Sequence, residues 1–248
     1  MRQLSLVLVV AALGIAAVCA AEPDILLVDE GGAASLETFY GPLCLNAGRT
    51  YQVWTVSKEG AVPATGLDAF RTVMWLTGST AKPSGIEGGA ANLVRYLQAG
   101  GRVILAGDHV GEASPEVLAA AFGLEFKRFS PALERINGRM PDVISQGWSL
   151  HLSPAGAEAA EYAKDEEARP RGETVFYAAD RGNSRLMAAR VESLEGKGYR
   201  AAWFGFDLQR VKDAARAAEV LTRTIRWTAP ELPAKAPVKQ FPKLYRGR

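Results

Sequence analysis

Short apolar runs that alternate with turns and amphipathic helices constrain this chain more than any other feature. Residues 24–29 (DILLVD) are almost continuously apolar, as in a strand that is buried on both faces. A glycine turn follows, and residues 34–46 then carry apolar side chains at helical spacing. Further strands are expected at 51–56, 70–76 and 102–106. This alternation predicts an α/β fold with a doubly wound, mainly parallel sheet.

Three more helices are expected after the third strand. Residues 86–99 place apolar side chains on one face and end at a pair of glycines, which is a common helix stop. Residues 114–122 begin with Ser114, which we expect to cap the helix, and with a proline at the first helical position. Residues 211–227 are expected to form a final helix that packs on the core.

The second half of the chain has a weaker pattern. Strands are expected at 173–178, 185–191 and 198–204, the last two as a hairpin-like pair. Residues 123–172 contain scattered polar side chains and several prolines without a sustained period. We interpret them as an insertion or variable region over the sheet edge.

The first twenty residues are typical of a secretory signal peptide. They contain one cation, a long apolar run and small residues near a cleavage point after Ala20. An uncleaved anchor is the alternative, and a lipid anchor on Cys19 is disfavoured because the bulky Val18 precedes it. We therefore expect an exported protein, periplasmic or extracellular, with its α/β domain in residues 21–228.

Residues 229–248 differ from the domain in composition. They hold five basic residues, one acidic residue and four prolines, so we expect an extended, solvated tail. The whole chain has a net charge of +2 and no basic face that would indicate nucleic acid binding. Cys44 is the only cysteine after residue 20, which excludes an intramolecular disulfide in the cleaved chain. No second apolar run has the length of a membrane span.

Several short motifs recur in the order of a known family. They are ILLVDEGG, YQVWTV, FRTVMWLTG, YLQAGGRVILAGDHVG and GYRAAWFGFDLQRV, followed by a helix that ends at Trp227. In this order they resemble the class I glutamine amidotransferase-like domains of secreted bacterial proteins. The resemblance covers most of residues 25–227 and implies a flavodoxin-like fold. Its motifs are mostly structural, so it carries little information on function.

The resemblance also implies where a catalytic nucleophile would lie. Catalytic amidotransferases carry Gly-x-Cys-x-Gly at the elbow after the fourth strand, whereas this chain has Gly-Asp-His-Val-Gly at 107–111. Cys44 lies in the first helix region, far from this elbow. The catalytic roles of the family are therefore not carried over to this sequence.

Asp108 and His109 allow two interpretations. Asp108 can accept hydrogen bonds from the backbone N–H groups that follow it and so act as a helix cap. Alternatively, it can pair with Asp29 or Asp207 beyond adjacent strand ends, as an acid/base couple or a clamp for sugar hydroxyls. The two residues can also point in different directions, because neighbours at a turn usually diverge.

Polar residues gather at the edge of the sheet where the parallel strands are expected to end, which we call the crest. Sheets of this kind bind ligands at that edge. His151 and Glu112 offer further hard ligands near this crest, but no zinc motif is present and we expect no metal. No nucleotide-binding motif is present, and we expect no cofactor. Trp148 is either a ligand-binding aromatic or an anchor that folds back on the protein. The candidate ligand-binding residues are Asp29, Glu30, Gly78, Asp108, His109, His151 and Asp207.

These observations favour an exported, non-catalytic accessory or binding module whose ligand is a carbohydrate, a peptide or a protein partner. The alternative is a hydrolase or sugar-modifying enzyme that acts through Asp108 with His109 or His151 as base. An enzyme requires at least two titratable groups that converge on one point.

Overall fold

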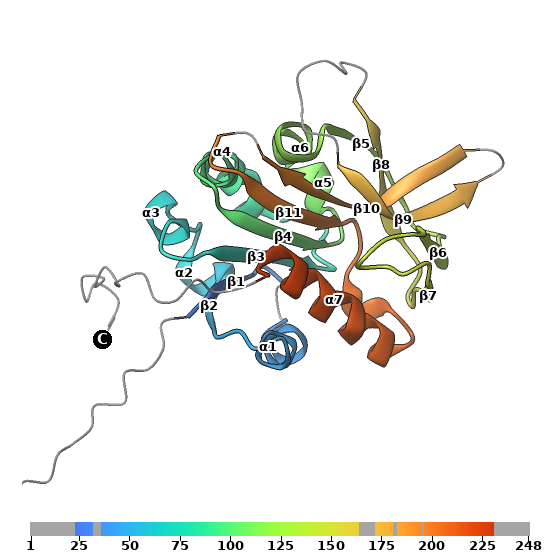
Figure 1. Ribbon diagram of the computed structural model, residues 1–248, viewed down its shortest axis with the longest axis horizontal. Helices are drawn as coiled ribbons and strands as arrows, with labels where there is room; N and C mark the ends of the chain where they lie inside the picture. The colour runs from blue at the N-terminus through green and yellow to red at the C-terminus, as the bar shows by residue number, and fades with distance from the viewer. Residues whose placement is uncertain (1–22, 32–35, 164–171, 181–182, 195, 231–248) are drawn as a thin grey trace, which may run out of the picture.

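Figure 1 shows the computed structural model, which describes residues 23–31, 36–163, 172–180, 183–194 and 196–230. The expected signal peptide and almost all of the expected tail lie outside the described residues. One continuous sheet of eleven strands runs through the described ranges.

Five parallel strands form the first half of the sheet, in the order β2-β1-β3-β4-β11. This order matches the flavodoxin-like pattern, and it confirms the doubly wound parallel sheet that the alternating runs predict. The strands β1, β3 and β4 are buried almost throughout, as their apolar sequences require. Their bounds are β1 Ile25–Asp29, β2 Tyr51–Thr55, β3 Thr72–Gly78, β4 Arg102–Gly107 and β11 Tyr199–Phe204.

Helices cover both faces of this sheet (Figure 1). One face packs against α1 (Glu37–Asn46) and α7 (Ala214–Thr228), which share a core with the inward residues of the strands. The other face packs against α4 (Ser84–Gln98) and the shorter helices that follow the fourth strand. The short helices are α2 Val56–Glu59, α3 Ala64–Leu67, α5 Val110–Ala113, α6 Pro115–Val117, the π-helical turn η1 Leu118–Phe122 and the 3-10 turn η2 Leu208–Arg210.

The second half of the sheet is antiparallel. β10 pairs with β11 on one side and with β9 on the other, which confirms the expected hairpin-like pair. The sequence of residues 123–172 indicates an insertion or variable region without a sustained period, but residues 123–163 contain four strands. These strands are short and half-exposed, and prolines separate several of them, so no long period develops. The four strands are β5 Leu124–Ser130, β6 Arg135–Gly138, β7 Ser149–His151 and β8 Ala157–Tyr162. The two long strands after them are β9 Glu173–Asp180 and β10 Asn183–Ser193.

The helix expected at 114–122 differs in detail. It consists of α6 followed by the π-helical turn η1, and Ser114 does not cap it. The Ser114 hydroxyl instead donates to the Val110 carbonyl at 2.6 Å. The preceding turn α5 supplies this acceptor, so the hydroxyl closes the junction between two short helices. Among the described residues, no helix is long and apolar enough to cross a membrane.

Candidate functional site

The turn from β4 into α5 forms the elbow at the centre of the crest. Gly107 has φ of +136°, and a Cβ there would lie 2.2 Å from the Thr77 hydroxyl oxygen. The Thr77 hydroxyl donates to the Asp108 carbonyl at 2.8 Å, and the Asp108 N–H donates to the Gly78 carbonyl at 2.7 Å. Only glycine allows β3 and β4 to approach so closely at this point. These bonds fix the direction in which the next two side chains leave the strand.

His109 occupies the middle position of the elbow. Its backbone is left-handed, with φ of 59°, which is uncommon for a residue with a side chain. The imidazole Nδ1 lies 2.7 Å from Glu112 Oε2, and the ring stacks on Phe129 with centroids 4.7 Å apart. The side chain is 23% exposed. The elbow therefore presents a partly exposed imidazole that is held by a carboxylate and an aromatic ring.

Glu158 is a fully buried carboxylate that the sequence analysis did not select. It lies on β8 and accepts the N–H groups of Gly111 at 2.7 Å and Glu112 at 2.9 Å, so it caps α5. Burial raises the pKa of Glu158 to about 7, although these two N–H groups and the nearby His109 counteract the shift. The available sequence signal was weak, because the alanine-rich strand β8 contains two glutamates, Glu158 and the exposed Glu161.

Asp108 neither caps α5 nor pairs with Asp29. Its carboxylate binds the guanidinium of Arg210, with 2.6 Å between Asp108 Oδ1 and Arg210 Nη1 and a second, shorter contact at Oδ2. Both side chains are less than 10% exposed. Arg210 also donates to the Pro154 carbonyl, with 3.0 Å from its Nε. Burial raises the pKa of Asp108, and the Arg210 cation counteracts this effect. The sequence analysis missed Arg210.

Asp207 follows the last parallel strand, β11, after two residues and caps the turn η2, and its charge raises the pKa of the Asp108 carboxyl. Its Oδ1 accepts the Tyr40 hydroxyl at 2.8 Å and the Gln209 N–H at 3.0 Å. Burial raises the pKa of Asp207 itself. This carboxylate ties α1 to the turn after β11. Asp108 and Asp207 do not hydrogen-bond to each other, and each carboxylate is engaged by other groups of the protein.

The two acidic residues after β1 are also engaged. Asp29 accepts the N–H groups of Gly31 and Leu36, each at 2.9 Å. Glu30 is 7% exposed and caps α4 by accepting the Gly85 and Ile86 N–H groups. It also accepts the indole N–H of Trp75 at 2.9 Å. Burial raises the pKa of Glu30.

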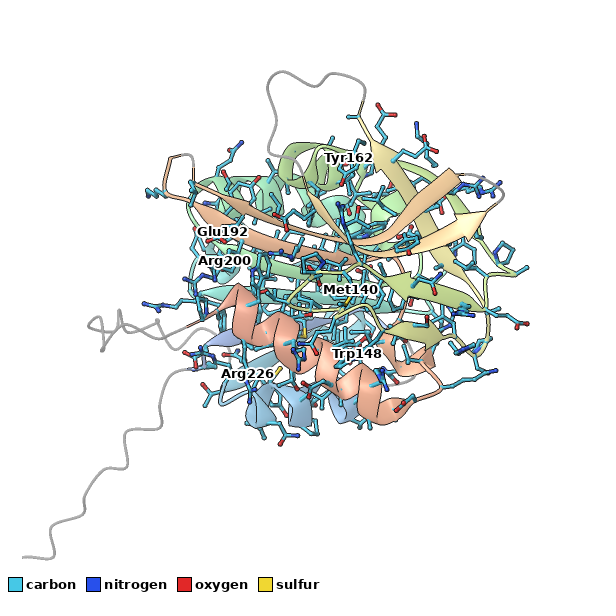
Figure 2. All side chains as sticks on the ribbon, turned by 45° about the vertical axis from the view of Figure 1, so that its right-hand side comes forward. Met140, Trp148, Tyr162, Glu192, Arg200 and Arg226 are labelled. Carbon is cyan, nitrogen blue, oxygen red and sulfur yellow. The ribbon has the colours of Figure 1, made fainter. Side chains whose placement is uncertain are left out.

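The remaining predicted residues are dispersed. Gly78 lies at the elbow with φ of +56°, close to Leu36. His151 is exposed on β7, opposite Arg135. Trp148, labelled in Figure 2, contacts the guanidinium groups of Arg216 and Arg223 on α7. These contacts support the anchor interpretation. Within the described ranges, no three His, Cys, Asp or Glu side chains are grouped as metal ligands.

Cys44 is fully buried on α1. Burial raises the pKa of its thiol to about 12, so the thiol stays protonated at neutral pH. Because the thiolate is the reactive form, this cysteine has the properties of a core residue.

Several solved structures have a fold similar to that of this chain. The N-terminal domain of mmIFT52 matches with a TM-score of 0.57 and 12% identity, over 82% of this chain and 96% of that domain. A ThuA-like protein from Bacteroides uniformis matches with a TM-score of 0.55 and 12% identity, over 87% and 96%. A glutamine amido transferase from Methylobacillus flagellatus matches with a TM-score of 0.53 and 10% identity, over 87% and 98%.

These likenesses establish the fold and nothing further. The chain has the flavodoxin-like architecture shared by glutamine amidotransferase-like and ThuA-like proteins, as the resemblance implied. No protein-family model and no curated protein matches the chain.

Proposed function

We propose that this protein is an exported, non-catalytic binding module of amidotransferase-like fold. The observation that carries the proposal is the state of the crest. The elbow Gly107-Asp108-His109-Val110-Gly111 contains no cysteine, serine or threonine. The crest carboxylates Asp29, Glu30, Asp108 and Asp207 all accept hydrogen bonds from the protein itself. Carboxylates that hold the fold together are poorly placed to transfer protons to a substrate.

The recognition surface in this proposal is His109 with Glu112 and Phe129. The imidazole offers one further ring nitrogen beyond the contact to Glu112, and the stacked rings give an apolar face. A polar group beside an aromatic face suits a carbohydrate or a peptide, and it also suits a loop of a protein partner. The acidic Glu112 disfavours an anionic ligand here.

The binding test compares the unaltered cleaved protein with three variants on an array of glycans and peptides. His109→Ala and Glu112→Gln are expected to lose at least about tenfold in affinity for whichever probe the unaltered protein retains. Glu116→Gln removes an exposed carboxylate from the adjacent helix and is expected to bind normally. An array without any retained probe, or binding that both variants keep, contradicts the proposal.

A second candidate function is a hydrolase in which His109 is the general base. The 2.7 Å contact between Nδ1 and Glu112 favours it, because a carboxylate in this position orients an imidazole. Turnover of glutamine or of an activated ester such as p-nitrophenyl acetate distinguishes the two functions. Turnover that disappears in His109→Ala, with the fold retained, supports the hydrolase and rejects the non-catalytic module.

Export is a separate part of the proposal and rests on residues 1–20. We expect the protein that leaves the cytoplasm to begin at Ala21, which N-terminal sequencing of the extracytoplasmic fraction measures. Recovery of the intact chain beginning at Met1 in the cytoplasm rejects export. Recovery of the intact chain in the membrane fraction supports the uncleaved anchor instead.

A further inference from the structure

A cluster of arginines lies at the end of the sheet opposite the crest, where the parallel strands begin. Arg102 starts β4 and stands beside Arg200 of β11 in the strand register, while Arg71 immediately precedes β3. Arg49 precedes β2 and lies near enough to act on Arg102 electrostatically. Burial is the largest cause of the lowered pKa of Arg102, and the cations Arg71, Arg200 and Arg49 lower it further. Several strands thus bring cations to one place.

Two arginines at this end of the sheet, one of the cluster and one on the neighbouring helix α4, form ion pairs with carboxylates. Arg200 binds Glu192, with 2.6 Å between Nη2 and Oε1, and both residues are labelled in Figure 2. Arg95 of α4 binds Asp68 at 3.1 Å. Arg49 has no carboxylate partner among the described residues, but its Nη2 donates to the Ala229 carbonyl. Within the described ranges, the guanidinium groups of Arg71 and Arg102 have neither a carboxylate nor a carbonyl partner.

Arg102 has an unmet hydrogen-bonding capacity. Its Nη1 is buried and has no hydrogen-bond partner among the described residues. The Arg71 side chain has no hydrogen bond or ion pair with the described part of the chain either. A buried, charged donor without a partner is costly, and neighbouring cations increase the cost. An anion bound between these side chains removes both penalties.

A cavity lies at the same position. It measures about 550 Å³, which is within the range of small-molecule sites. Its lining contains Arg71, Arg95 and Arg102 together with Asp68, so the net charge is positive. Phe70 and Tyr96 supply aromatic surface. Gly100 and Gly101, which precede β4, also line the cavity and contribute no side chain to it.

We propose that this cavity binds a small organic oxyanion, a phosphate ester or a carboxylate, whose charged group is held by Arg71 and Arg102. The planar guanidinium matches the geometry of both oxyanions and binds them through paired N–H groups. The half-buried Phe70 offers a surface for the uncharged part of the ligand. The volume favours a single small molecule over a polymer. This site is independent of His109 and of the crest.

Calorimetric titration of the cleaved protein tests the proposal with glucose 6-phosphate, glucuronate, inorganic phosphate and glucose as probes. At least one of the charged probes is expected to bind saturably, and glucose is expected not to bind. The charged probe that binds identifies the oxyanion as phosphate or carboxylate. Absence of saturable binding by all three charged probes overturns the proposal.

Variants separate this site from general attraction of anions. Arg102→Gln and Arg71→Gln are each expected to weaken binding at least about tenfold, because each removes a charged hydrogen bond. Arg135→Gln makes the same charge change on β6 and is expected to bind normally. His109→Ala is also expected to bind normally, which keeps this test distinct from that of the crest. Equal binding by Arg102→Gln, Arg71→Gln and the unaltered protein overturns the proposal.

Unfolding without ligand gives a second readout. Arg102→Gln is expected to leave the midpoint of thermal unfolding unchanged or to raise it, because the substitution removes an unpartnered cation from a like-charged cluster. A clear fall in the midpoint shows that the guanidinium has a structural role, and this result overturns the proposal.

Discussion

Asp108 of the elbow and Arg210 of η2 form a buried ion pair. They are 102 positions apart in the sequence and meet because η2 follows β11 directly beside β4. Removing one member leaves the other charge buried without its partner, which is far more costly than losing a helix cap. The stability of variants therefore distinguishes an ion pair from the cap that the sequence suggested.

We predict that Asp108→Ala lowers the free energy of unfolding by about 3–5 kcal/mol, against about 0.5–2 kcal/mol for a lost cap. Urea denaturation measures the difference. Asp68→Ala breaks the exposed pair with Arg95 and is expected to cost about 1 kcal/mol or less. The double variant Asp108→Ala/Arg210→Ala is expected to lose less than the sum of the two single losses. Additive losses contradict a coupled pair.

The orientation of the His109 side chain does not follow from the sequence of the elbow. The sequence places it at the middle of a Gly-x-x-x-Gly elbow, and the chain there contains no hydroxyl or thiol. The side chain's orientation depends on Glu112 and on Phe129, which comes from β5. A turn sequence alone does not reveal a stacking partner from another strand.

At the scale of elements, the helices α4 and α5 are capped by residues from elsewhere in the chain. The residue before α4 is Pro83, and the residue before α5 is His109, and neither side chain caps its helix. Glutamates from other elements take this role, Glu30 for α4 and Glu158 for α5. Each carboxylate satisfies N–H groups of the first helical turn, where the helix dipole also favours negative charge.

We predict that Glu30→Ala destabilises the protein by at least about 2 kcal/mol, because it removes the acceptor for Gly85, Ile86 and the Trp75 indole. Amide hydrogen exchange is expected to accelerate at Gly85 and Ile86. The exposed Glu87 of the same helical turn is the control, and Glu87→Ala is expected to cost about 1 kcal/mol or less. Unchanged exchange in Glu30→Ala shows that another group caps α4.

At the scale of the molecule, the antiparallel half of the sheet completes the crest of the parallel half. It supplies Glu158 beneath the elbow, Phe129 against His109, and the Pro154 carbonyl that accepts from Arg210. Residues 123–163 are therefore part of the site's architecture, and the two halves of the sheet are expected to unfold together.

The buried carboxylates also set how the stability of the whole molecule depends on pH. Burial raises the pKa of Glu30, Asp108, Glu158 and Asp207 above their ordinary values. A raised pKa means that the folded protein holds its proton more tightly than the unfolded chain does. The resulting stabilisation is fully present below the ordinary pKa and is lost as pH rises through the folded pKa.

For Glu158 this window extends from 4.5 to about 7. We predict that the free energy of unfolding falls across it, by up to roughly 3 kcal/mol from this residue. Urea denaturation at several pH values measures the slope. Glu158→Gln is expected to reduce the slope, although it also weakens the cap of α5. A variant with an unchanged slope rejects Glu158 as its source.

The sequence alone determined the parallel half of the sheet and which residues follow the ends of its strands. The alternating apolar runs and the glycines at turns are local signals, so β1, β3, β4, α4 and α7 and the placement of Asp108 and His109 at an elbow followed from them. Only the tertiary structure decided which partner each crest residue has. Arg210, Glu158 and Tyr40 meet the crest through contacts between residues far apart in the chain, and short, half-exposed strands carry too little pattern to reveal them. The same reason hid the arginine cluster, because its members begin different strands and become neighbours only when the sheet forms.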